Sequence, residues 1–132
     1  LGLEDRMTAK VGLLSGGQRQ ALTLLMATLV TPKLLLLDEH TAALDPSTAE
    51  KVLSLTGQIV AEKGITCMMV THNISSALSL GNRTVMMDAG RIVLQLSGAQ
   101  REAATVESLL AQFRAQVGKS LDNDRMLLTK EK

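Results

Sequence analysis

Residues 33–46 read KLLLLDEHTAALDP and contain the clearest strand and helix signals in the chain. The four consecutive leucines, Leu34–Leu37, form a short apolar run. The length of this run is typical of a central strand of a parallel sheet that is covered on both faces. Asp38 and Glu39 follow directly, so the predicted strand ends in two carboxylates.

A helix is predicted after this strand. Asp45 is a good N-cap, and Pro46 suits the first helical position. We expect the helix to continue to Lys63, because Gly64 is a typical C-terminal stop. The positions expected to face inward are Val52, Leu55, Ile59 and Val60.

A second apolar run, Ile65–Val70, predicts another buried strand, and Thr71-His72 follows it. Two buried strands joined by a helix indicate an α/β fold with a parallel sheet. In such sheets ligands bind beyond the carboxyl ends of the strands. We therefore expect Asp38, Glu39 and His72 to lie at one functional edge.

Upstream of the first strand, residues 1–13 read as an entry segment. Ser15 is the predicted N-cap of a helix that ends near Val30, before Thr31-Pro32. We expect this helix to be buried on more than one side. Its predicted apolar face comprises Ala21, Leu22, Leu25, Met26 and Leu29, thickened by Leu24.

Downstream, the pattern predicts a short helix over 74–80 and a hairpin whose strands are 83–88 and 91–96. Ala89-Gly90 has the length of a tight hairpin turn. A last amphipathic helix is expected over 106–117, followed by a polar tail over 118–132.

Composition excludes several classes of function. The chain has 132 residues and a net charge of +1, too balanced for electrostatic binding of DNA or membranes. Its aromatic content is 1%, and it has no Trp or Tyr, so stacking of nucleic-acid bases on those side chains is excluded. Cys67 is the single cysteine, which excludes a disulfide framework and a cysteine-based zinc site and points to the reducing cytosol. No apolar run approaches the roughly 18 residues of a membrane span.

The polar residues after the strands are of types that bind metal ions and phosphates. A carboxylate at the end of a buried strand, such as Asp38, can hold Mg²⁺ beside a nucleotide. An adjacent carboxylate, Glu39, can polarise a water for attack on phosphorus, and His72 can donate a hydrogen bond to a phosphate. Gly16 and Gly17 at a helix start let backbone N–H groups approach an anion. Taken singly, each of these residues is more often an ordinary strand end or helix cap.

Together, in this order, the residues resemble the ATP-binding-cassette (ABC) ATPases. Residues 14–18 match the LSGGQ signature, and residues 34–39 match the Walker B strand. Residues 43–45 match the D-loop, and His72 matches the switch histidine. The resemblance covers residues 1 to about 100 well and the C-terminal helix only loosely.

The resemblance implies the cofactors ATP and Mg²⁺ and a role for each matching residue. Asp38 would orient Mg²⁺ through its water shell, Glu39 would be the general base, and His72 would contact the γ-phosphate. Signature and D-loop residues would act on the nucleotide of a second ATPase subunit in a head-to-tail dimer, with Gln18 in a supporting role. These trans-acting residues would be Ser15, Gly16, Gly17, Gln18 and Asp45.

Two departures accompany the resemblance. His40 follows Glu39, where the family more often has Pro; we expect a tolerated loop variant. No phosphate loop G-x-x-x-x-G-K-[ST] occurs in the sequence, because Gly118-Lys119-Ser120 has Phe113 in place of the first glycine. With Leu1 in place of an initiator Met, this leads us to expect a fragment whose parallel sheet lacks neighbours and exposes apolar surface or pairs with another chain.

The resemblance implies a partial P-loop NTPase (RecA-like) layer in residues 1–117, completed by the hairpin and helix. The expected function is the ATP-hydrolysing subunit of a bacterial, importer-type ABC transporter, bound to permease subunits at the inner face of the membrane. A soluble cassette ATPase acting on nucleic acid or ribosomes is one alternative, although the chain has no basic patch. A truncated, non-enzymatic module that offers its signature in trans is another. Nothing in the sequence specifies a transported solute.

The missing phosphate loop generates a prediction. Backbone N–H groups and the lysine of that loop bind the phosphates and supply most of the affinity for a nucleotide. The 132-residue chain alone should therefore bind ATP weakly and not hydrolyse it. Isothermal titration calorimetry checks this, and stoichiometric ATP binding would overturn it.

Overall fold

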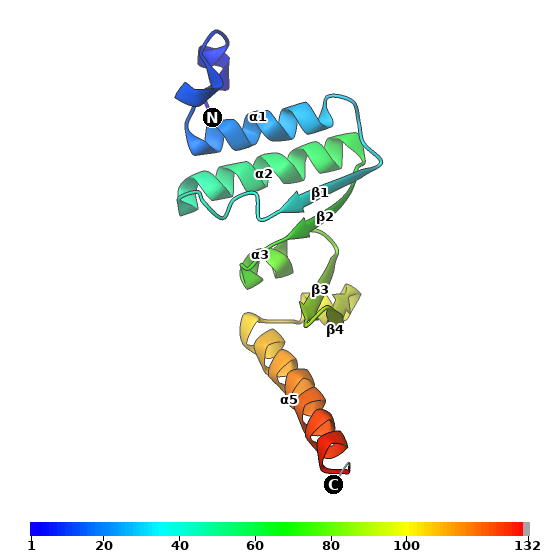
Figure 1. Ribbon diagram of the computed structural model, residues 1–132. Coiled ribbons are helices and arrows are strands. Elements are labelled where there is room, and N and C mark those ends of the chain that lie inside the picture. Colours follow the sequence, from blue (N-terminus) through cyan, green and yellow to red (C-terminus); the bar gives the residue numbers. More distant parts are fainter. Residues whose placement is uncertain (131–132) are drawn as a thin grey trace. The chain divides into compact units, whose positions relative to one another are not determined.

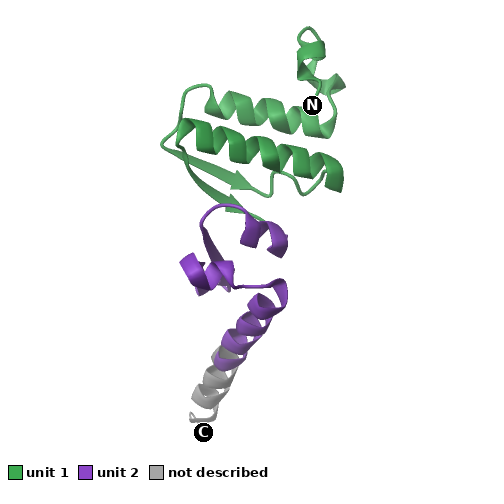
Figure 2. Ribbon diagram, turned by 180° about the vertical axis from the view of Figure 1, so that it is seen from behind, with its two compact units in different colours: residues 1–72 green, residues 73–132 purple. Residues whose placement is uncertain are grey.

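The computed structural model describes the backbone of residues 1–130 and the side chains of residues 1–119. It divides into two compact units, residues 1–72 and residues 73–132 (Figure 2). The predicted polar tail falls partly outside the described residues, at positions 131–132. Among the residues described, no helix has the length and apolar character needed to cross a membrane.

The first unit is a layer of helices on a parallel strand pair (Figure 1). Its elements are two 3₁₀ helices, η1 (Leu3–Arg6) and η2 (Val11–Leu13), then α1 (Gly16–Thr28), β1 (Leu34–Asp38), α2 (Pro46–Lys63) and β2 (Thr66–Val70). The strands pair in parallel from Leu34 opposite Thr66 to Asp38 opposite Val70. This confirms the predicted α/β class and the order of the elements.

In this unit, the caps of α1 and α2 and the stop of α2 lie where the sequence predicts them. Ser15 caps α1, and its side chain accepts a hydrogen bond from the backbone N–H of Gln18. Asp45 caps α2 by accepting from the N–H of Thr48 at 3.0 Å. Gly64 ends α2 with φ 61°, a left-handed conformation that glycine adopts without steric cost.

The core of this unit lies between the helices and one face of the strand pair. Leu24 of α1 and Ile59 of α2 pack with Leu35 of β1 and with Ile65, which precedes β2. Burying each such side chain contributes about 1.5–3 kcal/mol. The core therefore fixes how α1 and α2 lie on the sheet.

The opposite face of the strand pair is exposed, contrary to the expectation of a strand covered on both faces. Leu36 is 66% exposed and Met68 is 62% exposed, while Leu34 and Val70 are each half exposed. The reason is that both helices of this unit lie on the same side of its two strands (Figure 1). The exposed apolar face agrees with the expectation for a sheet without its neighbours.

The buried stripe of α1 also differs from the predicted one. It consists of Gly17, Ala21, Leu24 and Thr28, whereas Leu25, Met26 and Leu29 are exposed. Small residues allow α1 to approach α2 closely, so the contact follows residue size more than hydrophobicity. The predicted burial on more than one side was therefore wrong.

The second unit contains a β-hairpin and three helices. Its elements are α3 (Ile74–Ser79), β3 (Arg83–Asp88), β4 (Arg91–Ser97), α4 (Gly98–Glu102) and α5 (Val106–Lys130). The strands pair antiparallel, and Ala89 and Gly90 turn the chain with φ values of 46° and 75°. Positive φ at both central residues is typical of the tight hairpin turn that the sequence predicts.

Two features of this unit were not predicted. Helix α4 was missed, and α5 continues past Val117 to Lys130. Gly118 costs a helix interior about 1 kcal/mol relative to Ala but does not by itself end the helix. The predicted helix was therefore too short.

Arg101 of α4 holds the second unit together. Its Nε donates to Thr84 Oγ1 at 2.9 Å, and its Nη2 donates to the carbonyl of Leu80 at 2.5 Å. The guanidinium thus satisfies a carbonyl at the C-terminal end of α3, where a positive charge is favourable.

The exposed sheet face predicts self-association. Replacing a large exposed apolar side chain by a polar one, as in Leu36→Ser, should reduce association of the chain in sedimentation velocity. Its effect on stability should be about 0.5 kcal/mol or less, because Leu36 is mostly exposed.

Leu35→Ala is the matched control, since Leu35 is 6% exposed on the opposite face. It should destabilise the chain by about 2–5 kcal/mol. A wild-type chain that remains monomeric at high concentration would refute the expected pairing.

Candidate functional site

The ends of β1 and β2 meet at one edge of the sheet. Asp38, the last residue of β1, lies opposite Val70, the last residue of β2. The N–H of Glu39 then donates to the carbonyl of Val70 at 2.9 Å, so the ladder continues one bond beyond the strand. This register brings the residues that follow each strand side by side.

Glu39 and His72 meet at this edge. His72 Nε2 lies 2.6 Å from Glu39 Oε1. The side chain of His72 is 89% exposed and that of Glu39 is 30% exposed. At this distance the ring N–H donates to the carboxylate, and both groups can still meet a water or an anion from solvent.

The backbone of Glu39 has an unusual conformation. Its φ is 47°, in the left-handed region that non-glycine residues rarely adopt. Such a conformation costs about 1–3 kcal/mol and persists only where neighbouring contacts hold it. The carbonyl of Glu39 accepts from the N–H of Ala42 at 3.0 Å, which closes a tight turn after the strand.

His40 is engaged with helix α2. Its Nε2 lies 3.0 Å from Thr56 Oγ1, and burial lowers the pKa of His40. The ring is therefore mainly neutral near pH 7. The side chain of His40 thus links the loop after Glu39 to the helical layer.

Asp38 is an exposed carboxylate at the end of β1. Within the part of the chain that the structure describes, no three His, Cys, Asp or Glu side chains gather into a metal site. Mg²⁺ commonly takes one or two protein carboxylates and completes its shell with water and substrate phosphates. Asp38 fits this mode, in which the protein supplies only part of the shell.

The signature residues form the capped start of α1. Ser15 Oγ accepts from the N–H of Gln18 at 3.2 Å, and Gln18 Oε1 accepts from the N–H of Ser15 at 3.0 Å. Gln18 Nε2 also donates to the carbonyl of Leu1 at 3.0 Å. Because Ser15 uses its oxygen as an acceptor in the cap, its hydroxyl proton can be donated to another group.

Gly17 lies against the start of α2. A Cβ at this position would lie 2.2 Å from Cγ2 of Thr48, a distance that real Cβ contacts do not show. A Cβ on Gly16 would lie 3.2 Å from Cδ2 of Leu44. A side chain at Gly17 thus requires Thr48 to move, whereas at Gly16 a small shift of the Leu44 side chain would make room.

The D-loop residue Asp45 lies at this same helix start. Hydrogen bonds from Thr48 hold the pKa of Asp45 below its ordinary value. The carboxylate is exposed and ionised near neutral pH, where it stabilises the N-terminus of α2. The starts of α1 and α2 lie at the end of the unit toward which β1 and β2 point (Figure 1).

The predicted site residues thus form two groups within residues 1–72. Glu39 and His72 meet at the sheet edge, next to Asp38. The other group comprises Ser15, Gly16, Gly17, Gln18 and Asp45 at the starts of the two helices. Their functional roles stay predictions.

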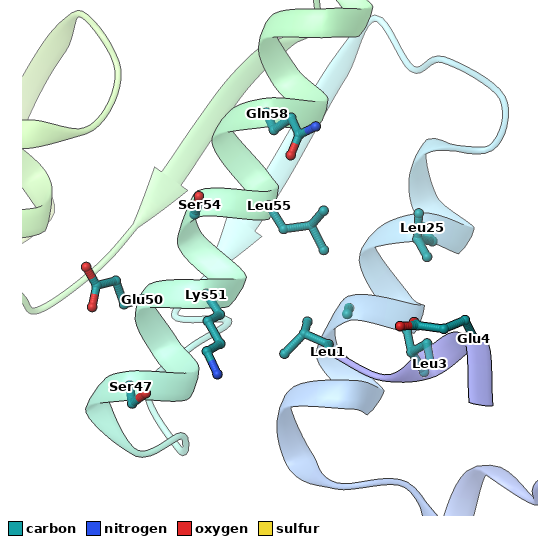
Figure 3. A pocket seen from close by; sticks show the side chains of 11 residues that line it. Leu1, Leu3, Glu4, Leu25, Ser47, Glu50, Lys51, Ser54, Leu55 and Gln58 are labelled. Carbon is teal, nitrogen blue, oxygen red and sulfur yellow. The ribbon is translucent and has the colours of Figure 1, made fainter. Parts of the chain in front are cut away.

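A separate groove of about 610 Å³ lies between α1, α2 and the N-terminal segment (Figure 3). Leu55 of α2 points toward α1, with Leu1 and Leu25 opposite. Glu50 and Lys51 also line it. None of the predicted site residues lines this groove, so it provides no support for the predicted chemistry.

Two threonines of α2 were missed in the sequence. Thr48 contacts the signature helix, and Thr56 bonds to His40. Thr48 lies three positions after the N-cap residue Asp45, and this spacing could have indicated that its N–H is the capping donor. Nothing local could indicate its contact with Gly17, which lies 31 positions earlier in the chain.

Comparisons with known proteins show what this chain is similar to. The family model described as ABC transporter matches residues 1–42. The tyrosine transport ATP-binding protein of Clostridioides difficile is 51% identical over 113 residues, which cover 86% of this chain and 45% of that protein. The methionine import ATP-binding protein of Corynebacterium jeikeium is 42% identical over 95 residues, which cover 72% and 26% respectively.

A solved ABC transporter in an inward-facing conformation has a similar fold. The TM-score is 0.65 at 32% sequence identity, and the match covers 80% of this chain and 42% of that chain. The chain thus spans less than half the length of each of these three proteins. The resemblance found in the sequence and the expected P-loop NTPase fold are confirmed.

The close approach of Gly17 to α2 is testable. Gly17→Ala should destabilise the chain by about 1–3 kcal/mol, because the added methyl overlaps Cγ2 of Thr48. Thermal unfolding measures the loss, and Thr48→Ala in the same chain should restore most of it.

Gly57→Ala is the matched control, since a Cβ there meets nothing within 4 Å. In the interior of α2 it should leave stability unchanged or raise it by up to about 1 kcal/mol. Equal stability of Gly17→Ala and the wild type would show that the contact is not formed.

Proposed function

We propose that this chain, which is similar in sequence and in fold to the ATP-binding proteins of ABC transporters, carries part of the ATP-hydrolysing domain of such a transporter. Residues 1–117 are the C-terminal part of that domain. The absence of a phosphate loop from the sequence supports a fragment that is inactive alone. The complete protein would bind and hydrolyse ATP.

Glu39 is the proposed general base. Its carboxylate is accessible yet held by a strained backbone and by the ring of His72. It can accept a proton from a water aligned for attack on the terminal phosphate. The 2.6 Å contact between Glu39 and His72 is the observation that carries this proposal, because it joins two motifs that lie far apart in the sequence.

His72 and Asp38 act beside this base. His72 Nε2–H, which bonds to Glu39 in the structure, can be donated instead to an oxygen of the γ-phosphate. Asp38 would hold Mg²⁺ through its water shell. Bound there, Mg²⁺ would neutralise charge on the phosphates.

The signature residues would act on a nucleotide bound to a second subunit. In a head-to-tail dimer, the hydroxyl of Ser15 and the backbone N–H groups of Gly16 and Gly17 would meet its γ-phosphate. The capped N-terminus of α1 suits this role, since helix N-termini attract anions. Gln18 supports the loop through the capping box, and Asp45 would cross the dimer interface.

The similarity to transporter ATP-binding proteins supports a proposal for the partners and the location. The complete protein would bind transmembrane permease subunits at the cytoplasmic face of the membrane and couple ATP hydrolysis to transport. Import is the proposed direction, because the similar protein of Corynebacterium jeikeium is named for methionine import.

The role of Glu39 is tested in a longer form of the protein that contains a phosphate loop. Glu39→Gln should leave ATP binding intact and lower turnover by about 10²–10⁴-fold, because the amide cannot accept the proton of water. Phosphate release and ATP affinity measure the two effects.

Glu50→Gln is the matched control, since Glu50 is an exposed carboxylate of α2 outside the predicted site. It should hydrolyse ATP at the wild-type rate. Near-normal turnover of Glu39→Gln would remove Glu39 from its proposed role.

A further inference from the structure

The loop that follows Glu39 is tied to helix α2 by a side chain of its own. His40 Nε2 lies 3.0 Å from Thr56 Oγ1. Thr56 is 6% exposed, and the adjoining Val52 is fully buried. The ring of His40 therefore reaches from the sheet edge to a buried position on the helical layer.

The direction of this hydrogen bond follows from the proton of Thr56. Thr56 Oγ1 donates to the carbonyl of Val52, one turn earlier in α2, at 2.8 Å. A hydroxyl has one proton, so its oxygen accepts the bond from His40. His40 Nε2 therefore carries a hydrogen and is the donor.

This bond adds a restraint on the chain at Glu39. On one side, the N–H of Glu39 is fixed to Val70 by the strand ladder. On the other side, the carbonyl of Glu39 accepts from the N–H of Ala42, and the side chain of His40 is hydrogen-bonded to Thr56 of α2. A residue with φ 47° needs such restraints, because its backbone would otherwise relax to an ordinary conformation.

We propose that His40 is a positioning residue for Glu39, and that it holds the carboxylate in place by donating a hydrogen bond to Thr56. The proposal rests on the proposed function in one respect, the role of Glu39 as general base. The restraint itself is a property of residues 38–56 and can be measured without ATP. His40 touches neither substrate nor metal in this account; it acts through the backbone that it shares with Glu39.

Hydrogen exchange of the 132-residue chain tests the restraint. His40→Ala should lower the protection of the Glu39 and Ala42 amides by about fivefold, which corresponds to the loss of one hydrogen bond. Amides in the middle of α2, such as that of Ile59, should keep their protection. Unchanged protection at Glu39 and Ala42 would overturn the proposal, and so would an equal loss at Ile59.

Conservative variants separate the hydrogen bond from the size of the ring. The Nε2 of Gln can replace that of His, so His40→Gln should retain the protection of the Glu39 amide. Thr56→Val removes the acceptor at nearly constant volume and should reproduce His40→Ala, whereas Thr56→Ser keeps the hydroxyl and should not. If His40→Ala fails to fold, the pair of Thr56 variants decides the question in the same way.

Turnover of a longer, phosphate-loop-containing form connects the restraint to catalysis. His40→Ala and Thr56→Val should lower kcat by about tenfold or more, with the KM for ATP unchanged. His40→Gln and Thr56→Ser should keep kcat near the wild-type value. An unchanged kcat, or a loss confined to KM, would overturn the positioning role. Should Glu39→Gln retain turnover, the proposed function fails instead, while the exchange result still reports on the restraint.

Discussion

The parallel pairing of β1 with β2 organises residues 1–72. Its register ends with Asp38 opposite Val70, and the ladder continues through the N–H of Glu39. This bond brings Glu39 to His72, although 32 residues separate them along the chain. A shift of one residue would turn every side chain of the strand to the other face. The register therefore decides both which leucines enter the core and which polar residues meet.

The helix starts carry a second constraint, which is one of space. Gly17 lies so close to Thr48 that no larger residue fits without movement, and Asp45 caps the same turn of α2. The two motifs expected to act in trans are thus packed together within one chain.

Features set by local chemistry could be predicted from the sequence. The caps Ser15 and Asp45 and the stop at Gly64 depend on residues within one helical turn, and all three were found where expected. The continuous apolar runs indicated parallel strands, and the strand ends indicated where Glu39 and His72 would meet.

Features set by distant partners could not be predicted. The buried face of α1 was misplaced because the small residue Gly17 packs against a helix that lies later in the chain. His40 was read as a loop variant, since its partner Thr56 is 16 positions away and carries no signal of its own. The contact of Arg101 with the end of α3 could not be predicted either, because its partner Leu80 is 21 positions away. Each of these contacts exists only once the elements are packed.

The most direct test of the central claim is a crystal structure of a longer, phosphate-loop-containing form with Mg²⁺ and a non-hydrolysable ATP analogue. Asp38, Glu39 and His72 of one subunit should surround the terminal phosphate and its metal. Ser15, Gly16 and Gly17 of a second subunit should contact the same phosphate. A nucleotide bound away from the carboxyl ends of β1 and β2 would contradict the proposed roles of these residues.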